Sequence, residues 1–227
     1  MLMSVRIPSR FGMVQRGISL VELLVGVALG LFLVAGASTL FVNHLGNSRR
    51  LLMEARLNQD LRAATDMVTR DLRRAGYWGN ALQGTVIASG ASAPTGNPYA
   101  AVSAAASTIT YDFSRDAAEN NVRDANERFI FDLSGGTIGM TISGTRQVVT
   151  DPETVFVTAF TITPTVTAVD IRDSCAKTCI GAGCPTITVR QYLVTIAGRA
   201  TRDASVTRTL QTRVRVRNDA FAGACPA

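Results

Sequence analysis

The sequence predicts an α+β fold in which one long N-terminal helix packs on an antiparallel β-sheet domain. Residues 18–42 form an apolar run with a single charged residue, and no proline occurs between residues 18 and 76. From Thr108 onward, apolar and polar residues alternate in several short segments, which is the period of a strand with one buried face. Helix signals therefore fill the first third of the 227-residue chain and strand signals fill the rest.

Residues 18–42 are long enough to cross a bilayer as a helix, because about 20 apolar residues span the hydrocarbon core. Arg6, Arg10 and Arg16 precede this run and a long polar domain follows it, which predicts a cytoplasmic N-terminus and an exported C-terminal domain. A cleaved secretory signal, with residues 35–37 as its small-residue cleavage site, is one alternative. An uncleaved signal anchor is another, whereas the length of the run argues against a buried core helix.

The balance of charge is partly a consequence of this topology. The formal net charge is +6, and it falls to +3 without residues 1–17, which carry three arginines and no acid. The basic character is therefore weak evidence for nucleic-acid binding, and we do not expect nucleic acid as a partner.

The helix is expected to continue beyond the apolar run. Residues 49–75 place apolar side chains at spacings of three and four, which brings them to one helical face. These residues are Leu57, Leu61, Ala64, Val68, Leu72 and Ala75. Because only the polar residues 43–47 intervene, we expect one helix from Ile18 to about Ala75, with Gly76 as its C-cap. Such a helix is roughly 85 Å long, so its first half lies in a membrane or helix bundle and its second half packs on a domain.

The rest of the chain is predicted to be rich in strands. Alternating patterns occur at residues 108–113, 128–133, 137–142, 155–163, 186–197 and 210–217. Ser134, Gly135 and Gly136 separate the second and third of these segments, which predicts a hairpin. Residues 89–107 are rich in Gly, Ala, Ser and Pro, which predicts a loop of low complexity.

The last predicted strand has one apolar face and one cationic face. Leu210, Thr212, Val214 and Val216 alternate with Arg213, Arg215 and Arg217. A solvated outer face, whose charge prevents edge-to-edge pairing, is one interpretation. The other is a contact surface for an anionic partner subunit or DNA. No aromatic residues alternate with these arginines, which argues against a stacking platform for nucleic acid.

The four cysteines, Cys175, Cys179, Cys184 and Cys225, all lie in the part predicted to be exported to an oxidising compartment. An even number in that setting predicts two disulfides. Of the three connectivities, we favour one bridge within residues 175–184 and one that ties down the tail through Cys225. A zinc site is the alternative, but the sequence has no Cys-x-x-Cys and its one histidine, His44, lies at the predicted membrane boundary.

The sequence offers little support for catalysis. A single histidine at the membrane boundary excludes Ser-His-Asp and histidine-metal sites, and no Gly-rich phosphate loop of the Walker type is present. We therefore expect no enzyme activity, no metal and no cofactor. We interpret one acidic stretch as a solvated loop, with calcium binding as the alternative although its spacing matches no known calcium loop. It contains Asp112, Asp116, Glu119, Asp124, Glu127 and Asp132.

The most specific motif lies where the apolar run begins. Residues 16–22 read RGISLVE, and Glu22 places a carboxylate inside the predicted span, at a cost of about 2.5–3.5 kcal/mol that suggests a function. This segment resembles the type IV prepilin signal. In that family a dedicated peptidase cleaves after the glycine and N-methylates the next residue, and the apolar segment is retained as a helix. The resemblance implies cleavage between Gly17 and Ile18 and N-methylation of Ile18.

The same resemblance assigns a role to Glu22, which would pair with the amine of Ile18 in its own or a neighbouring subunit. Gly26 and Gly30 form a Gly-x-x-x-Gly face that allows close helix packing. The chain departs from the family pattern at Ile18, where phenylalanine is commonest. It also lacks the mid-helix proline of many major pilins, which implies a straighter helix.

Residues 70–80, RDLRRAGYWGN, are similar to the helix end of PilW-type minor pilins, in which a basic helix terminus runs into Gly-Tyr-aromatic-Gly. We expect Tyr77 and Trp78 to pack over the sheet edge, with subunit contact as the alternative. The resemblance implies four parts: a leader at 1–17, a membrane-spanning and filament-core helix at 18–42, its amphipathic continuation at 43–76 and a periplasmic β-rich domain at 77–227.

The PilW-type resemblance also implies a function. The chain would be a minor pilin that resides in the inner membrane and then in the pilus, and helps to initiate type IV pilus assembly in a priming or tip complex. Its partners would be the prepilin peptidase, other minor pilins, the major pilin and the inner-membrane assembly platform. A type II secretion minor pseudopilin and a pilus-tip adhesin or DNA-uptake subunit are the alternatives.

Overall fold

The structure is a computed structural model that describes residues 17–84 and 95–226. The chain divides into two compact units, Met1–Arg49 and Arg50–Ala227. Helix α1 (Leu20–Leu72) runs without a break through the described part of the first unit and into the second. The polar residues 43–47 remain helical, so the prediction of one continuous helix is confirmed.

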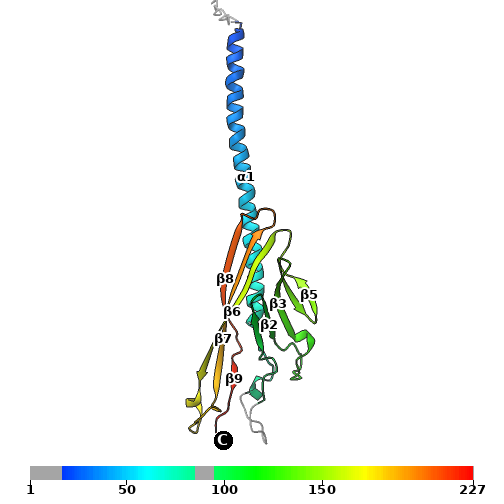
Figure 1. The fold of residues 1–227 in the computed structure, drawn as a ribbon, viewed down its shortest axis with the longest axis vertical. Coiled ribbons are helices and arrows are strands. Elements are labelled where there is room, and N and C mark those ends of the chain that lie inside the picture. The colour runs from blue at the N-terminus through cyan, green and yellow to red at the C-terminus, as the bar shows by residue number, and fades with distance from the viewer. Residues whose placement is uncertain (1–16, 85–94, 227) are drawn as a thin grey trace, which may run out of the picture. The chain divides into compact units, whose positions relative to one another are not determined.

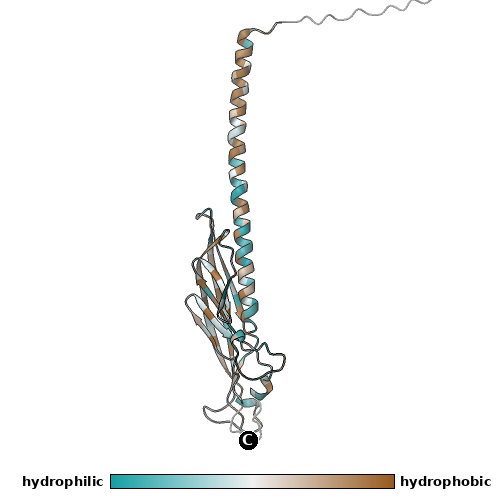
Figure 2. Cartoon of the chain, turned by 90° about the vertical axis from the view of Figure 1, so that its right-hand side faces the viewer, coloured by the Kyte–Doolittle hydropathy of each residue, from teal (hydrophilic) through white to brown (hydrophobic). Residues whose placement is uncertain are grey.

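The first half of α1 has the character of a membrane segment. Its side chains from Leu20 to Leu45 are exposed, and Figure 2 shows them to be largely apolar. The helix is long and apolar enough to cross a membrane near the N-terminal end of the described chain. Its first hydrogen bond joins the Leu23 N–H to the Ser19 carbonyl at 3.1 Å. Ser19 is therefore the N-cap, a position that serine favours, and the helix begins two residues later than predicted.

The C-terminal end of α1 also differs from the prediction, because the helix ends at Leu72 and not at Ala75. The next three residues form a tighter turn, in which the Ala75 N–H donates to the Leu72 carbonyl at 3.2 Å. Gly76 has the positive φ of +73° expected of a helix-ending glycine. Its N–H, however, donates to the Asp112 carbonyl at 2.8 Å, so a tertiary contact and not a helix carbonyl satisfies it.

The first sheet is an antiparallel meander of five strands in the order β1-β2-β3-β4-β5. The strands are β1 (Val102–Ala105), β2 (Thr108–Asp112), β3 (Arg128–Ser134), β4 (Thr137–Ile142) and β5 (Thr145–Val148). The predicted hairpin joins β3 to β4, and its Gly135 and Gly136 have φ values of +60° and +75°. Positive φ at both central residues gives a turn whose twist matches that of the flanking strands.

The second sheet contains the longest strands. β6 (Val155–Asp170) pairs with β7 (Thr186–Ala200), with a bulge between Val157 and Ala159, and β7 pairs with β8 (Thr207–Arg215). The short β9 (Ala220–Ala222) pairs with the start of β7. Three short 3₁₀ turns, Ala81–Gly84, Ala125–Glu127 and Arg172–Ser174, complete the described elements.

The core of the second unit forms where α1 meets both sheets. All six apolar residues predicted to share one helical face are at most 1% exposed. They join Ile109 and Phe131 from the first sheet and Val194 and Ile196 from the second sheet in one cluster. Full burial of a large apolar side chain contributes about 1.5–3 kcal/mol. The predicted α+β architecture, a long helix packed on antiparallel sheets, is confirmed.

The sequence patterns missed some of the sheet structure. Strands β1, β5 and β9 are three or four residues long, which is too short to show a clear alternation. The predicted loop at 89–107 is wrong in part, because it contains β1 and the fully buried Tyr99. Its residues 89–94 lie outside the described part of the chain. Composition missed these contacts because they are made with residues distant in sequence.

One buried hydroxyl lacks a hydrogen bond. The Tyr111 hydroxyl has no partner among the described residues, although the side chain is fully buried among the rings of Phe113, Phe129 and Phe131. We expect Tyr111→Phe to raise the free energy of unfolding by about 1 kcal/mol, because an unpaired buried hydroxyl costs that much or more. Chemical denaturation of the full chain in detergent measures the change.

Tyr99→Phe is the matched control, because the Tyr99 hydroxyl donates to a Glu119 oxygen at 2.9 Å. It should lower the free energy of unfolding. A Tyr111→Phe variant less stable than the parent would contradict the assignment of an unpaired hydroxyl.

Candidate functional site

The described part of the predicted processing segment lies before α1 and is accessible. Gly17, Ile18 and Ser19 precede α1, Ile18 is 75% exposed, and nothing lies within 4 Å of a Cβ built on Gly17. Glu22 lies in the first turn of α1, where the helix dipole favours a carboxylate. Residues 1–16, including the three leader arginines, lie outside the described residues. Cleavage after Gly17 and the pairing of Glu22 with the Ile18 amine stay predictions.

Gly26 and Gly30 lie on the exposed part of α1. Nothing is within 4 Å of a Cβ built on either residue, so the backbone between them is open to close approach. Residues four apart lie on the same helical face. This geometry permits another helix to pack there, but the packing itself stays a prediction.

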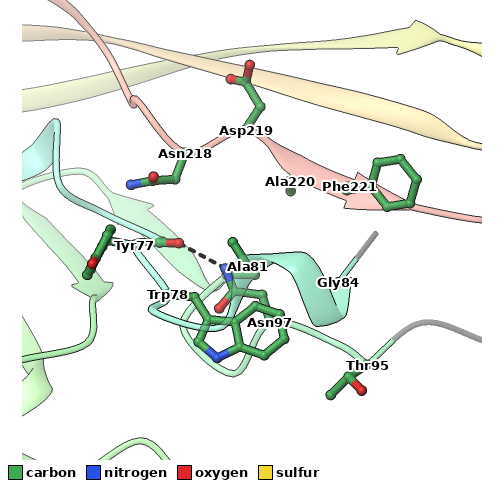
Figure 3. Close-up of a pocket in the computed structure, with 12 residues that line it drawn as sticks. Tyr77, Trp78, Ala81, Gly84, Thr95, Asn97, Asn218, Asp219, Ala220 and Phe221 are labelled. Carbon is green, nitrogen blue, oxygen red and sulfur yellow. Dashed lines mark hydrogen bonds between the residues drawn. The ribbon is translucent and has the colours of Figure 1, made fainter. Parts of the chain in front are cut away.

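The two aromatic residues after α1 have different environments. Trp78 is 3% exposed and its indole N–H donates to the Asn121 side-chain oxygen at 2.8 Å, whereas Tyr77 is 51% exposed. Trp78 also lines a cavity of about 270 Å³, with Asn218, Ala220 and Phe221 on its opposite wall (Figure 3). Trp78 is therefore held by packing, and the exposed Tyr77 is the one available for contact with another molecule.

A hydrogen-bond network centred on Glu119 orders the chain beside this cavity. Glu119 accepts hydrogen bonds from the Gly79 N–H at 2.9 Å, the Tyr99 hydroxyl at 2.9 Å and the Asn121 N–H at 3.0 Å. Burial opposes ionisation of Glu119, but these hydrogen bonds, together with one from the Ser114 side chain, outweigh it and lower its pKa from the ordinary value. The carboxylate thus joins three loop segments.

The interpretation of the acidic stretch as a solvated loop is wrong for three of its residues. Asp132 lies in β3 and pairs with Arg146 at 3.0 Å, and the other two are buried. Asp112 is 1% exposed and pairs with Arg128 at 3.1 Å and Arg123 at 3.4 Å. Glu127 is fully buried and accepts hydrogen bonds from the N–H groups of Asp124 and Arg115 at 2.7 and 2.8 Å. A buried carboxylate is stable only when it is paired and hydrogen-bonded. Asp112 is paired from β3 and from the loop before it, and Glu127 is hydrogen-bonded within that loop.

No group of three or more His, Cys, Asp or Glu side chains that could hold a metal ion is found among residues 17–84 and 95–226. The cysteines instead form two disulfides, Cys175–Cys225 and Cys179–Cys184. The first ties the C-terminal tail, including β9, to the chain beyond β6, and the second closes a short loop between β6 and β7. Together they anchor the end of the long β6–β7 hairpin.

The three predicted surface arginines, Arg213, Arg215 and Arg217, are exposed as expected, and Val214 and Val216 are buried between them. Arg215 pairs with Asp219 at 2.8 Å. Together with Arg73 at the end of α1, the three arginines line an open groove of about 450 Å³. Sequence reasoning missed Arg73, because its proximity to β8 depends on how the helix packs on the sheet.

Comparison with known proteins identifies one family. Residues 50–216 match the family model described as prepilin peptidase-dependent protein B, which covers well over half of the chain. No curated protein and no solved structure matches the chain. The match takes in the second half of α1 and both sheets through β8, and the predicted processing segment lies outside it.

The two disulfides close loops of very different length, with sequence separations of 50 and 5 residues. Loop-closure entropy then predicts a loss of about 4 kcal/mol on removing Cys175–Cys225 and about 2 kcal/mol on removing Cys179–Cys184. Denaturation of the paired Cys→Ser variants under non-reducing conditions measures both. A larger loss for the short loop would show that chain entropy does not govern these bridges.

Glu119 should contribute stability that depends on pH. Because its folded pKa is lowered from the ordinary value of 4.5, the contribution is complete above that value and is lost as the pH falls through the folded pKa. Glu119→Gln should therefore be less stable than the parent at pH 7, and the difference should shrink as the pH falls through the folded pKa of Glu119. Thermal unfolding across this pH range is the measurement. Glu153→Gln, at an exposed acid, is the control and should follow the parent throughout.

Proposed function

This chain belongs to the prepilin peptidase-dependent protein B family, and from that premise we propose that it is a minor pilin subunit that helps to initiate type IV pilus assembly. The observation that carries the proposal is the continuity of α1. The helix begins two residues after Ile18, exposes an apolar surface through its first half and buries an apolar face in the sheet domain through its second half. A subunit that is first held in a membrane and then in a helix bundle needs an apolar anchor and a domain-packing face in the same chain segment.

The family name implies dependence on prepilin peptidase, and the first half of α1 is fit to be a single-pass anchor for a C-terminal domain. We propose the finer assignments on this basis. The peptidase cuts between Gly17 and Ile18, the domain from residue 77 lies in the periplasm, and the anchor leaves the inner membrane when the subunit enters the filament. The resemblance of residues 70–80 to PilW-type proteins supports a priming or tip complex with other minor pilins, the major pilin and the assembly platform.

We further propose that an ion pair of Glu22 with the Ile18 amine fixes the axial position of the subunit against its neighbour. Cleavage would place a positively charged amine on Ile18, four residues before the Glu22 carboxylate. In an apolar environment each charge costs several kcal/mol when it is alone, so the two are most stable as a pair within or between subunits. Gly26 and Gly30 would let the neighbouring helix approach closely enough for that pair to form.

No catalytic role is assigned, because the pilin-related family is structural. The disulfides suit an exported domain, since such bonds persist in oxidising compartments. A type II secretion minor pseudopilin would share the same helix and processing segment, so co-purifying subunits, and not the fold, distinguish the two roles.

The proposal predicts a specific N-terminus. Expression of the full chain with a prepilin peptidase should yield a protein that starts at N-methyl-Ile18, and expression without it should yield the uncut chain. Intact mass and N-terminal sequencing of the membrane-extracted protein measure this. A start within residues 36–40, or an uncut chain in both strains, would exclude the pilin role and leave a secreted or simply anchored sheet domain.

Two variants separate processing from assembly. Gly17→Val should remain uncut, because the peptidase site would be lost. Glu22→Gln should be cut normally but should recover less of the other pilins on co-purification, because it keeps the shape of the side chain and lacks the charge. A Glu22→Gln protein that assembles like the parent would contradict the pairing with Ile18.

A further inference from the structure

One edge of the second sheet has free backbone hydrogen-bonding groups. The Ala200 N–H donates to the Val206 carbonyl and the Val216 N–H to the Arg190 carbonyl, so the even-numbered residues of β8 bond to β7. Because these groups alternate along an antiparallel strand, the N–H and C=O of Arg213 and Arg215 point away from β7. No strand pairs with β8 on that side in the described chain (Figure 1).

The open edge ends at a defined point. The next outward group, the Arg217 N–H, donates to the Arg73 carbonyl at the end of α1 at 3.0 Å. The outward groups of Arg213 and Arg215 make no hydrogen bond that involves another described residue. The free edge therefore lies within the groove of about 450 Å³ that Arg73, Arg213, Val214, Arg215, Val216 and Arg217 line.

The groove is strongly cationic. It contains four guanidinium groups, of which that of Arg215 pairs with Asp219. Arg73, Arg213 and Arg217 form no ion pair with any residue in the described ranges. The groove thus offers backbone N–H and C=O groups for an extended chain and unpaired guanidinium groups for carboxylates, at adjacent positions.

The opposite edge of the same sheet is different. The Ile171 N–H donates to the Pro185 carbonyl, so the register places the even-numbered residues of β6 with their backbone groups facing outward. Pro164 occupies one of these positions, where its missing N–H protects the edge from another strand. β8 has no proline. Charged side chains can also protect an edge from pairing. At β8, however, the arginine side chains border a groove, and three of the four groove arginines form no ion pair with a described residue.

We propose that the free edge of β8 at Arg213–Arg215 is a docking site for an extended, carboxylate-bearing segment of another protein chain, which adds to the sheet as a further strand. Strand addition supplies main-chain hydrogen bonds, and the arginines select acidic side chains. A nucleic acid would satisfy the arginines but not the alternating backbone groups. Only the identity of the partner, as another pilin subunit, rests on the proposed function.

The test uses the full chain in detergent and a fluorescent synthetic peptide in which glutamate alternates with valine. Two further peptides carry N-methyl groups on either the glutamate amides or the valine amides. In a given strand orientation, only one of these two sets of backbone N–H groups can face β8. Fluorescence anisotropy should show that the parent peptide binds and that one N-methylated peptide loses binding while the other keeps it. Replacing glutamate by glutamine should weaken binding.

The protein variants test the same groove. Arg213→Thr with Arg217→Thr should weaken binding of the parent peptide by roughly tenfold, because two charge-assisted contacts are lost. Arg56→Thr with Arg62→Thr, at exposed arginines of α1 outside the groove, is the matched control and should bind like the parent. Unchanged thermal unfolding and intact disulfides establish that both proteins are folded.

Two results would overturn the proposal. Equal binding of the two N-methylated peptides would mean electrostatic attraction without strand addition, and competition by a DNA duplex in that case would favour a nucleic-acid surface. Unchanged binding by the Arg213 and Arg217 variant would place the site elsewhere. N-terminal sequencing of the same preparation, made with the prepilin peptidase, distinguishes the two proposals. A chain that starts at Ile18 but does not bind the peptide contradicts only the docking edge. An uncut chain that binds the peptide contradicts only the pilin role.

Discussion

The burial of one apolar face of α1 is the interaction on which the sheet domain depends. Leu57, Leu61, Val68 and Leu72 contribute to a single core with residues of both sheets, so the helix packs against two sheets whose strand ladders are separate. The same helix has no comparable burial in its first half, where its apolar side chains remain exposed. That apolar surface is stable only in lipid or against other helices. The continuous helix therefore attaches the sheet domain to the membrane or to the helices that cover this surface.

The C-terminal end of α1 connects this core to the candidate surfaces. Gly76 bonds to the end of β2, Arg217 to Arg73, and the Asn218 side chain to the Ala75 carbonyl. Arg190, which is 8% exposed, donates to the carbonyls of Ala100 and Asn218. Chain segments more than 100 residues apart thus meet within a few residues of the helix end.

The proposed assembly role assigns different tasks to the two units. The first unit carries the predicted processing segment, the Glu22 carboxylate and an apolar helix, which are features that neighbouring subunits could share. The second unit carries the surface features of the sheet domain, namely the exposed Tyr77, the disulfide-anchored hairpin and the cationic edge of β8. Specificity among pilins would then come from the sheet domain, because similar apolar helices discriminate poorly between partners.

Much of this architecture could be read from local periodicity. The sequence by itself determined the continuous helix, its buried face, the β3–β4 hairpin and the alternation of valine and arginine in β8, because each depends on spacing over a few residues. Only the tertiary structure decided the pairing of the cysteines, the short strands β1, β5 and β9, the burial of Asp112 and Glu127, and the place of Arg73 beside β8. The physical reason is that these features depend on which distant segments pack together, so a carboxylate that looks solvated in sequence becomes buried when the fold supplies its hydrogen bonds and its ion pairs.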